Sequence, residues 1–66
     1  MKTQTESIRE HLIQNRTITP MEALNLFGCF RLAARISDLR ESGMEIKTNM
    51  IHKGRKKFAE YIFKQP

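Results

Sequence analysis

The chain has 66 residues, of which 39% are hydrophobic and five are aromatic, and its formal net charge is +5. A chain of this length can bury one small core, so we expect a single domain spanning residues 1–66. No apolar stretch approaches the roughly 20 residues of a membrane span, and no secretory leader pattern is visible, which predicts a cytoplasmic protein. The single cysteine, Cys29, excludes an internal disulfide and fits a reducing compartment.

The first predicted element is a helix over about residues 5–15. Thr3 or Thr5 can serve as its N-cap, and Ile8 and Leu12 form its apolar stripe. The three residues that follow, 17–19, are β-branched and indicate a short extended link. This link can pair with a later hairpin as a third strand.

The second predicted element is a helix over residues 20–27, with clear signals at both ends. Thr19 is a strong N-cap, Pro20 suits the first helical position, and Glu22 can complete a capping box with Thr19. Gly28 can end the helix because it tolerates positive φ. The apolar face of this helix consists of Ala23, Leu24 and Phe27.

A third helix is predicted over about residues 29–42. Leu32, Ile36 and Leu39 recur at helical spacing, with Ala33 beside them, and form the buried side. Helical projection places Arg35 and Arg40 on the two flanks. The opposite, solvent-facing side consists of Phe30, Arg31, Ala34, Ser37, Asp38 and Glu41.

After Gly43 the apolar period changes from helical to two, which predicts a hairpin over residues 44–63. Ile46, Thr48 and Met50 alternate with polar residues as in a half-buried strand. Residues 52–55 form the turn, with Gly54 at its positive-φ position. In the returning strand, Ala59, Tyr61 and Phe63 are predicted to face inward. The whole order predicts a mostly α fold with a small β-hairpin, a winged helix-turn-helix of three helices and a two- or three-stranded wing.

The excess positive charge lies entirely in the second half of the chain. Residues 1–28 hold three basic and three acidic residues, whereas residues 29–66 hold nine basic and four acidic residues. Charge concentrated on the third helix and the hairpin favours a polyanion partner, and a merely solubilising surface is the alternative.

Four residues of the third helix are candidates for contacts with DNA bases. Arg31 is the best of them, because its planar fork can address the two acceptors of guanine. Ala34 and Ser37 can make short methyl or polar contacts. Phe30 can touch a thymine methyl group, with packing in the core as the alternative.

The flanking arginines, Arg35 and Arg40, suit phosphates better than bases. In the alternative interpretation, Arg35 forms an ordinary solvent-exposed pair with Asp38. Asp38 counts against DNA binding, because phosphates repel a carboxylate. The hairpin tip supplies further backbone contacts, unless its basic residues serve only solubility. These residues are Lys53, Arg55, Lys56 and Lys57.

Signals for catalysis are missing. His11, His52 and Cys29 do not have the spacing of metal ligands, and the chain has no glycine-rich phosphate loop. The chain is also too short to shape a substrate pocket. We therefore predict a protein that is not an enzyme and that uses no metal and no cofactor.

The central half of the chain resembles the small helix-turn-helix domain found in many phage and prophage proteins. The pattern of that family reads roughly I-T-x-x-E-A-L, a glycine, then R-L-A-A-R-I-x-x-L-R-x-x-G-x-x-I. It is matched here by Ile18, Thr19, Glu22, Ala23, Leu24, Gly28, Arg31, Leu32, Ala33, Ala34, Arg35, Ile36, Leu39, Arg40, Gly43 and Ile46. The resemblance implies a phage-encoded DNA-binding protein that carries Arg31 and Arg35 on its recognition helix.

Residues and resemblance together predict a protein that binds duplex DNA in a bacterial cytoplasm. The expected role is transcription regulation in a bacteriophage or prophage, or excisionase-like organisation of DNA. Useful specificity would need a homodimer or cooperative assembly, because one small module makes few base contacts. The alternative is a winged-helix protein-interaction module that inhibits a host protein, of the anti-defence type.

Overall fold

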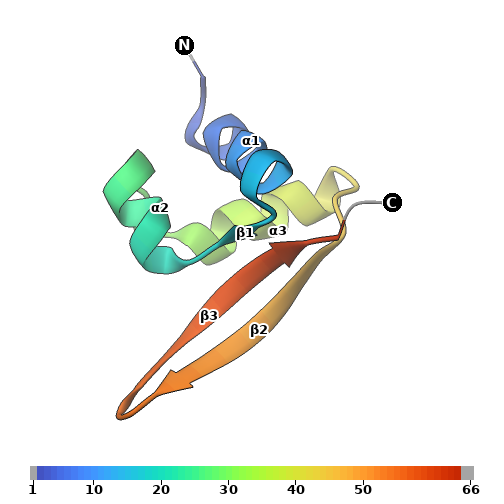
Figure 1. The fold of residues 1–66 in the computed structure, drawn as a ribbon. Helices are drawn as coiled ribbons and strands as arrows, with labels where there is room; N and C mark the ends of the chain where they lie inside the picture. The colour runs from blue at the N-terminus through green and yellow to red at the C-terminus, as the bar shows by residue number, and fades with distance from the viewer. Residues whose placement is uncertain (1, 65–66) are drawn as a thin grey trace.

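The computed structural model describes residues 2–64 and shows three helices and a three-stranded antiparallel sheet (Figure 1). The elements are α1 (Gln4–Asn15), β1 (Thr17–Ile18), α2 (Pro20–Phe27), α3 (Leu32–Glu41), β2 (Ile46–Lys53) and β3 (Lys56–Phe63). This arrangement confirms the predicted fold. Each helix within residues 2–64 is too short or too polar to cross a membrane.

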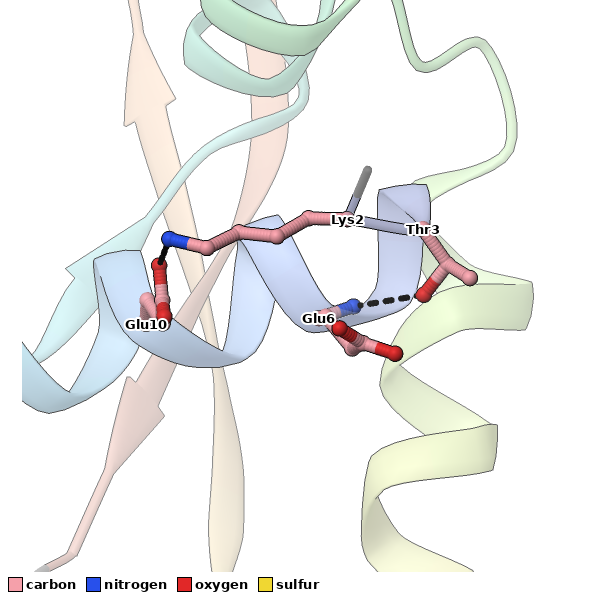
Figure 2. Close-up of polar contacts among 4 residues, drawn as sticks. All are labelled: Lys2, Thr3, Glu6 and Glu10. Atoms are coloured by element: carbon pink, nitrogen blue, oxygen red, sulfur yellow. Dashed lines mark hydrogen bonds and ion pairs between the residues drawn. The ribbon is translucent and has the colours of Figure 1, made fainter.

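The first turn of α1 is held by local contacts (Figure 2). Thr3 is the N-cap, and its Oγ1 accepts a hydrogen bond of 3.1 Å from the backbone N–H of Glu6. The side chain of Lys2 extends along α1 and forms an ion pair with the carboxylate of Glu10. Of the two predicted caps, Thr3 rather than Thr5 therefore begins the helix.

Helix α1 ends at Arg16, which adopts the left-handed conformation with φ +69°. A side chain with a Cβ atom is strained there, whereas glycine is not. We expect Arg16→Gly to raise the free energy of unfolding by roughly 0.5–1 kcal/mol in urea denaturation. Arg16→Ala is the control, since it removes the same charge and keeps the Cβ atom. Equal stabilities of the two variants would contradict the explanation.

Both predicted ends of α2 are present. Thr19 and Glu22 form the capping box: the Glu22 N–H donates to Thr19 Oγ1 at 3.2 Å, and the Thr19 N–H donates to Glu22 Oε1 at 3.0 Å. Gly28 has φ +63° and donates its N–H to the carbonyl of Leu24 at 2.9 Å. The helix therefore covers Pro20–Phe27, as the sequence predicts.

Helix α3 begins at Leu32, so the predicted start at Cys29 is wrong. The Cys29 N–H donates to the carbonyl of Ala23 at 3.1 Å and thereby continues the cap of α2. The chain needs residues 28–31 to turn before a new helix can begin, and Arg31 becomes the N-cap. At the other end, the helix stops at Glu41 and Ser42 is its C-cap.

The strand order of the sheet is β1-β3-β2. The two residues of β1, Thr17 and Ile18, pair with Ile62 and Tyr61 and form the predicted third strand. Strand β2 pairs with β3 along its full length, and Gly54 with φ +58° allows a two-residue turn at the tip. The hairpin extends well beyond the helices (Figure 1).

The core lies where the three helices meet the base of the sheet. Tyr61 is buried, and Ala59 and Phe63 pack against the core, which confirms the inward face predicted for β3. Ten hydrophobic residues are buried within residues 2–64: Ile8, Leu12, Ile18, Ala23, Cys29, Leu32, Ile36, Leu39, Ile46 and Tyr61.

Four residues predicted to be inward-facing are exposed. Thr48 and Met50 lie on the part of the hairpin that extends past the helices, so only Ile46 of the alternating set in β2 is buried. Ala33 is exposed because it lies on the flank of α3 rather than beside the buried stripe, and Leu24 remains 37% exposed on α2. The core is therefore narrower than the sequence pattern predicts.

Candidate nucleic-acid interface

The solvent-facing side of α3 carries two small residues, Ala34 and Ser37, and two acidic residues, Asp38 and Glu41, all of them exposed. The small size of Ala34 and Ser37 would allow the backbone of the helix to come close to the floor of a groove there. Ala34 and Ser37 are therefore exposed on the solvent-facing side of α3, as the sequence predicts.

Phe30 and Arg31 lie in the turn before α3 rather than on the helix. Phe30 is 88% exposed, so the interpretation that it packs in the core is wrong. Arg31 is exposed and makes no capping hydrogen bond with its side chain. Both residues line a shallow hollow together with Gln4, Gly28 and Arg35. The aromatic ring of Phe30 and the guanidinium of Arg31 therefore line the same hollow just before α3.

Arg35 forms the pair that the alternative interpretation anticipates. Its Nη2 lies 3.5 Å from Oδ2 of Asp38, and both side chains are partly exposed. Such a pair contributes about 0–1 kcal/mol to stability. It nevertheless places a cation beside the carboxylate, which reduces the repulsion that Asp38 would exert on a phosphate. Arg35 Nε is buried without a hydrogen-bond partner among the described residues.

Arg40 connects α3 to the base of the wing, a role that the sequence does not reveal. Its Nε and Nη2 donate to the carbonyl of Ile46 at 3.0 and 2.8 Å, and Nη2 also donates to Thr48 Oγ1 at 2.9 Å. The guanidinium thereby covers the outer edge of β2. Arg40 is still exposed, so its charge remains available at the junction between α3 and the wing.

The four basic residues of the wing tip, Lys53, Arg55, Lys56 and Lys57, are all exposed. Lys53 and Lys56 lie directly opposite one another in the hairpin. Like charges in this position repel each other. Neither of the two ion pairs found within residues 2–64 includes a residue of this tip. The tip is therefore a concentration of positive charge without a counter-charge from the described chain.

The two histidines, which the sequence analysis considered as metal ligands, lie in separate parts of the structure. His11 lies on α1 with its ring 5.8 Å from that of Phe27, whereas His52 lies on the wing. Within residues 2–64, no group of three or more histidine, cysteine or acidic side chains could hold a metal ion.

A family model described as a winged helix-turn-helix domain matches residues 3–66. No curated protein matches the sequence significantly, and no solved structure does.

Proposed function

Because the chain belongs to the winged helix-turn-helix domain family, we propose that it binds duplex DNA without carrying out a catalytic step. Helix α3 would enter the major groove, and the wing would follow the neighbouring backbone. The observation that carries this proposal is the uncompensated cluster of four cations at the tip of a projecting hairpin. A cluster of this kind lowers the stability of the free protein and gains favourable contacts with phosphates.

The proposed contacts fall into two groups. Arg31 would read a guanine from the start of α3, and Phe30 would contact a thymine methyl group beside it. Ala34 and Ser37 would face the base edges. The contacts with phosphates would come from Arg35, Arg40, Lys53, Arg55, Lys56 and Lys57.

We further propose that the protein regulates transcription in a phage or prophage, or organises DNA as an excisionase-like factor. It would act in the cytoplasm of the bacterial host. The narrow recognition surface supports binding as a homodimer or as a cooperative assembly, because a single helix of ten residues reaches few base pairs.

Binding of a labelled duplex from the upstream region of the gene tests the proposal. We expect the protein to prefer this duplex to a scrambled one, and Arg31→Ala to weaken specific binding about 5- to 150-fold. The reason is the loss of a bidentate contact with guanine. Arg16→Ala removes the same charge from the end of α1 and should bind normally.

Two outcomes would change the proposal. Equal binding of the native and scrambled duplexes would leave only the architectural role. No binding even at low salt would overturn DNA binding and favour the alternative, a module that inhibits a host protein.

A further inference from the structure

A groove lies between the first turn of α2 and the beginning of β3, which line it from its two sides. Its volume is about 810 Å³. Thr19, Pro20 and Met21 line it from the side of α2. Residues 55–58 line it from the side of the wing. We call this hollow the α2–β3 groove.

The floor of the α2–β3 groove is apolar and accessible. Met21 is 65% exposed, and Phe58 is partly exposed. The strand register places Phe58 opposite Ile51, on the face of the sheet that does not carry the core. Apolar side chains gathered in this way mark a contact surface more often than isolated ones do. The floor therefore fits an apolar side chain of a partner.

The rim of the groove is basic. Arg55, Lys56 and Lys57 line it, and no acidic residue does. The two ion pairs observed within the described chain both lie elsewhere. This charge pattern is complementary to carboxylates, and it opposes the docking of a second copy of this basic chain.

The backbone of β3 is open along the same groove. Strand β1 pairs only with Tyr61 and Ile62, and after Ile18 the chain turns away into α2. Backbone groups of alternate residues point to the same edge of a strand, so those of Lys57 and Ala59 face the edge that β1 leaves uncovered. An extended peptide can add to such an edge as a further strand.

We propose that the α2–β3 groove binds an extended acidic segment of a partner protein. One apolar side chain of the segment lies between Met21 and Phe58, its carboxylates face the basic rim, and its backbone pairs with β3. The basic rim shares Arg55, Lys56 and Lys57 with the proposed phosphate contacts, whereas Met21 and Phe58 of the floor belong to the groove alone. The groove lies on the β1 side of β3, whereas Arg40 connects α3 to the outer edge of β2, across the sheet.

The test uses the whole protein and a labelled synthetic peptide in which glutamate and valine alternate around one central phenylalanine. We expect saturable binding by fluorescence anisotropy, and Met21→Glu to weaken it about tenfold or more, because the new carboxylate repels the peptide and blocks the floor. Met50→Glu is the matched control: Met50 is also exposed, at 49%, but lies on β2 outside the groove. It should change the affinity less than about twofold.

Three outcomes would overturn the proposal. Equal losses in the two variants would show attraction by net charge alone. Unchanged binding of a peptide that is N-methylated at alternate amides would exclude strand addition. If Met21→Glu weakened binding of duplex DNA but not of the peptide, the groove would belong to the DNA interface. Circular dichroism should show that both variants keep the parent fold, since both methionines are exposed.

Discussion

The substitution Ile36→Ala is expected to unfold a large part of the protein population. Ile36 is fully buried in the middle of α3, and it belongs to the core cluster that joins all three helices to the sheet. Removing the buried methyl and methylene groups of an isoleucine costs about 2–5 kcal/mol. A core of this size rarely supplies more than about 3–5 kcal/mol of net stability. The two quantities are similar, so little stability should remain.

Urea denaturation followed by circular dichroism measures this effect. Ile36→Val is the control, because it removes one methylene group and should cost only about 0.5–1.5 kcal/mol. If the alanine variant unfolded at nearly the same urea concentration as the parent protein, Ile36 would not be the centre of the core.

The second large effect is expected in DNA binding, when glutamine replaces Lys53, Arg55, Lys56 and Lys57 together. Log affinity falls as log salt rises, and each phosphate contact that is lost reduces the steepness of this fall by about 0.9. The magnitude of the slope should therefore decrease by about 3–4. At low salt the affinity should fall roughly a hundredfold or more. Fluorescence anisotropy at several salt concentrations measures both quantities.

A control for net charge replaces four basic residues outside the wing by glutamine: Lys2, Arg9, Arg16 and Lys64. It should retain most of the slope. Unfolding should not account for the loss in the wing variant, because relief of the repulsion between Lys53 and Lys56 stabilises the hairpin. Equal slopes in the two variants would mean that the wing holds no phosphates.

The elements that could be predicted from the sequence are those that depend on local interactions. The capping box links Thr19 and Glu22, which are three positions apart, and the buried stripe of α3 repeats at helical spacing. The sequence also predicts a third strand at residues 17–19, because these residues are β-branched and the only hairpin predicted in the chain can pair with them. Such features are visible because their partners are near one another in the chain.

The features that cannot be predicted from the sequence depend on residues that are distant in the chain, or on the number of residues that a turn between two helices requires. The turn at residues 28–31 takes the place of a first helical turn, so Phe30 and Arg31 lie before α3 rather than on it. Arg40 binds a carbonyl on β2, and no spacing rule indicates that bond. The α2–β3 groove is lined by Met21 and Phe58, which are far apart in the sequence. The sequence indicates it only through Phe58, an apolar residue on the outer face of a strand.

The projection of the hairpin beyond the helices has a consequence for motion. From the Asn49–Glu60 pair to the turn, the two strands have little buried surface beneath them. A two-stranded hairpin alone is marginally stable in water, so this part can open while the helical body stays folded. Its amides should exchange hydrogen with solvent much faster than those near Ile36. A ligand that needs the closed wing must supply the free energy of closing it, so changes in hairpin pairing alter affinity without altering global unfolding.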